Sequence, residues 1–280
     1  MHKRVIDDKL MADFQAHLWE DEKSRATIEK YLRDVRAFGV FAANREVDKG
    51  LVLQYKNLLL RDYTISSANS MLAALNACFR FFGWMDCCVK HYKVQRKTYC
   101  SEEKELTREE YYRLVRAAEK KGDERLRLIL QTICGTGIRV SELRCITVEA
   151  VRKGEAVVSC KGKTRTVFLV PELRRQLMRY VKVKGITAGP CFVTRSGKPM
   201  SRCNIWREMK ELCALAEVSP EKVFPHNLRH LFARIFYGIE KDIAKLADLL
   251  GHTSINTTRI YIMTTGAEHK KKLQNMRLII

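Results

Sequence analysis

The chain has 280 residues, of which 46% are hydrophobic, so it can bury the cores of two domains, and wholesale disorder is excluded. Its 52 Lys and Arg against 32 Asp and Glu give a formal net charge of +20. A protein of this charge is expected to meet a polyanion, with nucleic acid as the first candidate, although such charge can also serve solubility alone.

The basic charge is spread over both halves, because residues 1–100 carry 17 basic and 12 acidic side chains and residues 101–280 carry 35 and 20. Ten cysteines are scattered through apolar segments without a paired C-x-x-C spacing, which predicts free thiols in a reducing compartment. The sequence has no apolar leader and no apolar run of membrane-spanning length. We therefore expect a cytoplasmic, nucleoid-associated protein with no membrane partner.

The first ninety residues read as helices. Ser24 can cap a helix over 25–45, and apolar residues recur at helical spacing through 64–84. A shorter helix is expected over 47–63. The pattern predicts a helical domain of four to five helices over residues 1–90.

Residues 91–104 interrupt this pattern. The stretch around them, "VKHYKVQRKTYCSEEKE", lacks a sustained apolar face and changes from basic to acidic. It is expected to be a linker, either a solvated surface loop or a basic strap along a phosphate backbone.

Residues 105–280 predict a second, mixed domain. Thr107 followed by Glu110 is typical of a capping box for a helix over 108–122, and another helix is expected over 124–137. Short strands are expected over 145–151, 155–160 and 165–170, the last two joined by the turn "KGKT". Helices return from Glu172. The fold class is thus mostly α with a small antiparallel β-sheet.

The stretch "VFPHNLRHLFARIF" (223–236) carries unusual polar residues on an apolar helix. At 100° per residue its apolar side chains share one arc, and His226, Arg229 and His230 lie on the opposite side. Pro225 suits the helix start, which places His226 in the first turn, where anions bind favourably. Alone, this pattern is more often that of a solvated helix face.

Three other places extend the pattern. In "GTGIRVSEL" Arg139 follows a glycine-bearing turn, and Glu142 can hold its guanidinium. In "CKGKT" Lys161 stands at a hairpin tip. In "LADLLGHTSINTTRIYI" a helix ends at Gly251, His252 follows, and a further helix carries Tyr261.

Taken in order, these residues resemble the tyrosine recombinase family, the phage-integrase-like and Xer-like DNA strand-exchange enzymes. The likeness lies in "TGIRVSEL", "HNLRH" and "LGHTSINTTRIYI", and in the order Arg, Lys, His-x-x-Arg, His, Tyr. It implies that residues 1–90 form a SAM-like core-binding domain and 105–280 the catalytic domain with a C-terminal tail helix.

The resemblance also implies roles for single residues. Tyr261 would be the nucleophile, and Arg139 and Arg229 would clamp the scissile phosphate. His226 would accept or share the tyrosine proton, and His252 would hydrogen-bond a phosphate oxygen. A lysine would protonate the leaving 5′-oxygen; Lys161 is the better match, and Lys163 stays open because the hairpin is shorter than the family often has. Supporting roles fall to Glu142 and His230, and expected DNA contacts are Lys93, Arg96, Lys97, Lys163, Arg165 and Arg202.

Elementary chemistry agrees with these roles. Negative charge gathers on phosphate oxygens during attack, and two guanidiniums can neutralise it where it develops. A phenol with a pKa near 10 costs about 4 kcal/mol to ionise at pH 7, so a base and a cationic pocket are needed. A covalent phosphotyrosine conserves the bond energy for rejoining. No cofactor and no metal are therefore expected.

Two other functions fit part of the sequence. A non-catalytic helix-turn-helix protein would explain the charge and the segment 242–262, but would leave the four upstream polar residues unexplained. A type IB topoisomerase-like enzyme shares the cleavage chemistry but acts as a monomer without site preference.

The expected partners are double-stranded DNA recombination sites, further copies of the chain in a homotetramer on synapsed DNA, and accessory DNA-bending or directionality proteins. The tail "AEHKKKLQNMRLII" (267–280) is expected to form a short helix, packed either on its own domain or on a neighbouring protomer.

Overall fold

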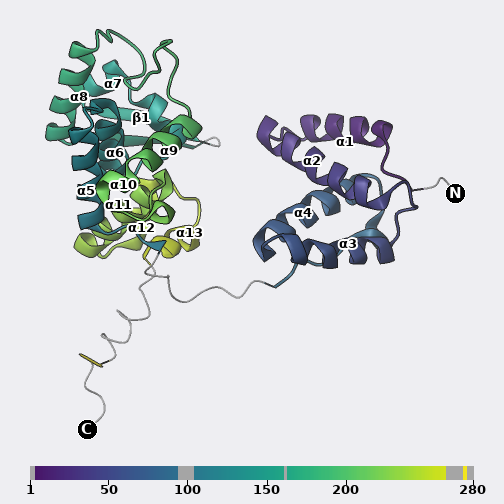
Figure 1. Cartoon of the computed structure of the whole chain (residues 1–280). Coiled ribbons are helices and arrows are strands. Elements are labelled where there is room, and N and C mark those ends of the chain that lie inside the picture. The colour runs from purple at the N-terminus through teal and green to yellow at the C-terminus, as the bar shows by residue number, and fades with distance from the viewer. Residues whose placement is uncertain (1–3, 94–103, 161–162, 263–273, 276–280) are drawn as a thin grey trace. The chain divides into compact units, whose positions relative to one another are not determined.

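The computed structural model describes residues 4–93, 104–160, 163–262 and 274–275. The chain divides into two compact units, residues 1–96 and 97–280, and the division falls within the predicted linker. Figure 1 shows the first unit as helices α1 to α4 and the second as a larger helical body that includes strand β1. The predicted fold class, mostly α with a small antiparallel sheet, is confirmed.

The N-terminal unit is built from four capped helices. They are α1 (Asp8–Glu20), α2 (Arg25–Ala42), α3 (Lys49–Asp62) and α4 (Ile65–Phe81), followed by the short 3₁₀ helix η1 (Met85–Cys87). Each α-helix begins after a side chain that accepts a backbone N–H of its first turn: Asp7, Ser24, Asp48 and Thr64. The core between the helices contains the rings of Phe14, Phe38 and Phe79.

The C-terminal unit is arranged around α6 (Glu124–Thr136), which packs against α5 (Arg108–Lys120), α8 (Pro171–Val183) and α11 (Pro225–Glu240). The predicted Thr107–Glu110 capping box is present at the start of α5. After α8 in the chain, the unit also contains α9 (Arg202–Glu211), α10 (Cys213–Ala216), η4 (Pro220–Lys222), α12 (Ile243–Leu250), α13 (Ile255–Arg259) and η5 (Ile260–Ile262).

Two strands form the sheet in the described part of the chain. Strand β1 (Glu155–Cys160) pairs antiparallel with β2 (Lys163–Phe168), with Cys160 opposite Lys163 and Val158 opposite Arg165. Alternation turns Val158 and Val167 to the core, while Val157 and Phe168 lie on the exposed face.

The strand predicted over 145–151 is wrong. Residues up to Cys145 form the 3₁₀ helix η3 (Val140–Cys145), and α7 (Val148–Lys153) follows. Only Thr147 makes an isolated bridge, to Pro190. The run of β-branched residues is typical of a strand. Here Thr147 instead begins a helix, because its hydroxyl accepts the Ala150 backbone N–H.

Cys78, Cys134, Cys191 and Cys213 are free and buried. In the described residues no helix is long and apolar enough to cross a membrane. The tail prediction falls almost entirely outside those residues.

Candidate active site

Arg139 is delivered by a turn that requires glycine. Helix α6 ends in Gly137, whose φ of +65° is the left-handed conformation, and a Cβ there would lie 2.5 Å from the ring of Phe232. The chain therefore turns tightly against α11 before η3 begins. At the start of η3 the Arg139 backbone N–H donates to Glu142 Oε2 over 2.8 Å. The glycine pattern thus has a packing role as well as a turning role.

Glu142 is a buried carboxylate between two arginines. Arg165 donates to both of its oxygens, over 2.9 and 2.7 Å, and Arg139 Nη1 donates to Oε1 over 2.9 Å. Burial raises the pKa of the Glu142 carboxyl, but the hydrogen bonds from Arg165 and Arg139 outweigh it and lower the pKa to about 2. The carboxylate is therefore ionised at neutral pH and fixes the position of both guanidiniums.

Arg229 is more deeply buried than its helical position predicts. Only 1% of the residue is exposed, because α11 is covered on the side that the sequence pattern assigns to solvent. Its Nη1 donates to the Gly137 carbonyl over 2.5 Å and its Nη2 to the Leu250 carbonyl over 2.8 Å. These carbonyls end α6 and α12, where the helix dipole is negative, so two helix C-termini stabilise one cation.

The Arg229 guanidinium keeps unused donor capacity. Its Nε is buried and has no hydrogen-bond partner among the described residues. Burial lowers the pKa of Arg229 to about 10, and repulsion from Arg139 acts in the same direction, so the group remains a cation at neutral pH. A buried cation with a free N–H is suited to an incoming anion.

Tyr261 lies among three imidazoles. The Tyr261 hydroxyl is 3.4 Å from His226 Nε2. The centroid of the Tyr261 ring lies 4.2 Å from the ring centroid of His230 and 5.2 Å from that of His252. The tyrosine is only 5% exposed. It stands in the 3₁₀ helix η5, directly after α13.

All three histidines are neutral at pH 7. Burial lowers the pKa of each, to about 4 for His230 and His252, and the neighbouring arginines act in the same direction. A neutral His226 can accept a proton from the tyrosine hydroxyl.

A cavity of about 910 Å³ opens beside this cluster. Arg139, His226 and Arg229 line it on one side. Helix α9 lines the other side, and the half-exposed indole of Trp206 belongs to this wall. The site is therefore a concave surface that carries several arginines, with the buried phenol of Tyr261 next to His226, and it is suited to a phosphate group.

The other predicted site residues differ in their exposure and in whether the structure describes them. Arg202 is exposed on the first turn of α9 and lines the cavity. Lys93 is exposed in the N-terminal unit. Arg165, expected to contact DNA, instead has its side chain 12% exposed against Glu142. Lys163 is described in its backbone at the start of β2. Three predicted residues lie outside the described ones: Arg96, Lys97 and Lys161.

Sequence reasoning missed Thr258, whose hydroxyl lies 2.8 Å from His252 Nδ1, and the contribution of Trp206 and Arg207 to the cavity. The spacing of Thr258, three residues before Tyr261, was a usable signal, because such residues share a helix face. No local sequence pattern predicts that α9 lines the cavity, because only tertiary packing places it there.

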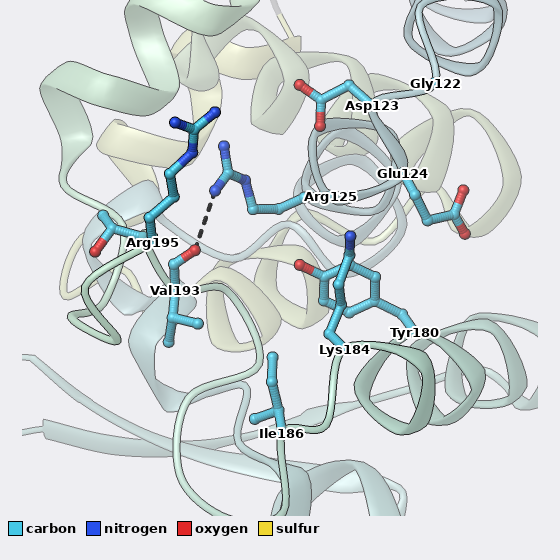
Figure 2. Close-up of a pocket in the computed structure, with 10 residues that line it drawn as sticks. Gly122, Asp123, Glu124, Arg125, Tyr180, Lys184, Ile186, Val193 and Arg195 are labelled. Carbon is cyan, nitrogen blue, oxygen red and sulfur yellow. Dashed lines mark hydrogen bonds between the residues drawn. The ribbon is translucent and has the colours of Figure 1, made fainter.

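A second, smaller cavity of about 390 Å³ lies at the opposite end of α6 (Figure 2). The first residues of α6 and the end of α8 line it, and Arg125 donates to the Val193 carbonyl across it. Helix α6 has 13 residues and so spans about 20 Å, which separates this pocket from the arginine and histidine cluster. In the described residues no group of three or more His, Cys, Asp or Glu could hold a metal ion.

Comparison with known families gives two matches that together cover most of the chain. The model of the "Phage integrase family" matches residues 104–268, and that of the "Phage integrase, N-terminal SAM-like domain" matches residues 11–84. The first includes every residue of the cluster.

Individual relatives cover the whole chain. Tyrosine recombinase XerA of Pyrococcus furiosus is 28% identical over 291 residues, covering 100% of this chain and 98% of that protein. XerA of Thermococcus kodakarensis is 30% identical, with 98% and 96% covered.

Solved structures share the fold. A lambda integrase dimer bound to a COC′ core site has a TM-score of 0.75 at 19% identity, with 92% of this chain and 95% of that one covered. XerH bound to its difH substrate has a TM-score of 0.68 at 17% identity, with 98% and 91% covered.

Proposed function

Since the chain belongs to the phage integrase family, we propose that it is a site-specific recombinase that cuts and rejoins DNA through a 3′-phosphotyrosine intermediate. The observation that carries the proposal is the convergence of Arg139, Arg229, His226 and His252 on Tyr261, from positions up to 122 residues apart in the sequence. A DNA-binding protein without chemistry has no need to bury a cation with a free N–H beside a phenol.

The proposed reaction is a transesterification at phosphorus. The Tyr261 oxygen forms a bond to the scissile phosphorus while the bond from phosphorus to the 5′-oxygen breaks. His226 takes the phenol proton, and a lysine gives a proton to the leaving 5′-oxygen. The reverse step with a 5′-hydroxyl from a second site exchanges the strands. Arg139 and the unused donors of Arg229 bind the phosphate oxygens as their charge grows.

The register of the sheet favours Lys163 over Lys161 as the proton donor. Val167 is buried, and Arg165 reaches Glu142, so the row 165, 167 on β2 faces the core and the active site. Lys163 therefore occupies the next position of that row. In the adduct assay below, Lys163→Ala should slow cleavage more than Lys161→Ala, and the reverse order would restore Lys161.

Binding to DNA would draw on both units. Arg202 in the cavity wall and Lys93 in the N-terminal unit are exposed and free to meet phosphates. Such contacts predict an affinity that falls steeply with salt. Arg165 is proposed to orient Glu142 and not to contact DNA.

The working assembly is proposed to be a homotetramer on two synapsed sites, with the tail reaching a neighbouring protomer. A lambda integrase tetramer bound to a Holliday junction has the same fold, with a TM-score of 0.74. Removal of residues 268–280 should then weaken synapsis of paired sites while leaving binding to one site intact. Unchanged synapsis would reject the tail exchange.

The test of the proposal is a covalent trap. The full chain is produced in cells, denatured rapidly, and freed of DNA that is not covalently bound; the DNA that remains attached is then sequenced. We expect a recurrent site and an adduct at Tyr261. Tyr261→Phe should form no adduct, a loss of at least about 1000-fold, yet bind the recovered site with unchanged affinity.

The same experiment separates the alternatives. Binding of the recovered site by both proteins without an adduct would favour the helix-turn-helix function. An adduct spread over unrelated sequences, with relaxation of supercoils by single protomers, would favour the topoisomerase function.

A further inference from the structure

The imidazole of His252 is held at both nitrogens. Its Nε2 lies 3.0 Å from Arg229 Nη2, and its Nδ1 lies 2.8 Å from Thr258 Oγ1. A guanidinium can only donate, so Nε2 must be the acceptor of that contact. A neutral imidazole carries one proton, which must then sit on Nδ1, and the Thr258 hydroxyl oxygen accepts it.

The surroundings of His252 keep this arrangement neutral. Burial lowers its pKa to about 4, and the charges of Arg229, Arg139 and Arg165, with a contribution from His226, act in the same direction. At pH 7 the ring therefore carries a single proton. The contact with the hydroxyl decides which nitrogen holds it.

Thr258 has no other evident use for its hydroxyl. The residue lies on α13 with 0% exposure, and its Oγ makes no other hydrogen bond among the described residues. A valine has nearly the same shape and would fill the same space. Its neighbour Thr257 on the same helix is exposed. A buried hydroxyl with one partner points to a function exerted through that partner.

We propose that Thr258 is a positioning residue, whose hydroxyl accepts the Nδ1 proton of His252 and thereby holds Nε2, as an acceptor, towards Arg229. The inference rests on the proposed recombinase function and assigns a task within it. Without the hydroxyl, the proton can move to Nε2, where it would face an arginine N–H. His252 would then turn, and Arg229 would lose one of its three acceptors.

The test compares three variants of the full chain on the DNA site recovered by the covalent trap. Single-turnover cleavage is measured at saturating protein, together with affinity for the site. Thr258→Val should slow cleavage at least about 10-fold, because small misplacements at a reacting centre are costly. Thr258→Ser restores the acceptor and should stay within about 3-fold of the parent. Thr257→Val is the matched control and should be unchanged, and all three should bind DNA normally.

Two outcomes would overturn the proposal. Parent-like cleavage by Thr258→Val would show that the hydroxyl has no role, and equal losses in Thr258→Ser and Thr258→Val would show that an acceptor at this position is not sufficient and that the exact shape of the side chain decides instead.

A second measurement separates this proposal from the recombinase function itself. Nitrogen-15 NMR of the imidazoles in the free protein should show His252 protonated at Nδ1 in the parent and in Thr258→Ser, but not in Thr258→Val. Because no DNA is present, this result stands even if no adduct forms on any site. Protonation at Nε2 in the parent would refute the assignment.

Discussion

The two units of the molecule bury polar side chains for different purposes. In the N-terminal unit, Asp34 pairs with Lys30 one turn away, and Asn76 bonds to both the N–H and the carbonyl of Val89. These contacts satisfy polar groups that folding has buried. In the C-terminal unit, Arg229 lines a cavity and keeps a donor unused, and Glu142 holds Arg139, which lines the same cavity.

The difference lies in how each buried polar group uses its hydrogen-bonding capacity. A structural polar group is fully satisfied by its own fold, as Asn76 is. A group prepared for a ligand is held firmly on one side and left open on the other, as Arg229 is. Substitutions in the N-terminal unit should therefore change stability, and those in the C-terminal unit should change chemistry.

Among the tests of this contrast between the two units, the largest effect is expected from Arg229→Lys. A lysine keeps the charge but cannot contact two helix-terminal carbonyls, His252 and a phosphate together. We expect single-turnover cleavage to fall by about 10²–10³-fold, as for loss of one donor to a developing oxyanion, with DNA affinity changed little. Arg33→Lys, at an exposed side chain that pairs with the buried Asp34 in the N-terminal unit, is the control and should leave the rate unchanged. Equal rates for the two variants would remove the contrast between the units.

The next effect concerns stability. Asn76→Ala leaves the N–H and the carbonyl of Val89 without partners in a buried position, at a cost of about 2 to 4 kcal/mol in the free energy of unfolding. Asn69→Ala removes the same pair of contacts to Tyr92 at a partly exposed position and should cost less. Denaturant unfolding measures both. Cleavage per bound protein should match the parent, and a loss of rate in either variant would link this unit to the chemistry.

Much of this organisation could be predicted from local patterns. The caps at Ser24 and Thr107 and the ordered polar residues depend on short spacings, which a sequence displays directly. The burial of Arg229 could not be predicted. A helical pattern reports one apolar face and cannot reveal that the ends of α6 and α12 supply acceptors on the other.

The pairing of Arg165 with Glu142 was missed for a related reason. The two residues are 23 positions apart and meet only because β2 runs past η3. Basic residues in a hairpin equally fit a DNA contact, and only the tertiary structure decides between the two.

The smallest effect is a pH dependence that the C-terminal unit should impose on stability. The folded-state pKa of His230 is about 4, below the unfolded value near 6.5. Between these pH values His230 binds a proton in the unfolded chain but not in the folded chain. Stability is therefore fully present above pH 6.5 and is lost as the pH falls towards 4, with a slope of up to about 1.4 kcal/mol per pH unit.

His252 has the same low pKa and adds a similar slope, whereas the Glu142 carboxyl, with its pKa of about 2, loses its contribution only below about pH 4.5. Denaturant unfolding at pH 7, 6 and 5 thus isolates the histidines. His230→Phe retains an aromatic ring against Tyr261 but cannot titrate, so its stability should fall less steeply than that of the parent over this range. Parallel curves for the two proteins would mean that His230 takes up its proton equally in the folded and unfolded chain, and that its contact with Tyr261 does not exclude the charged form.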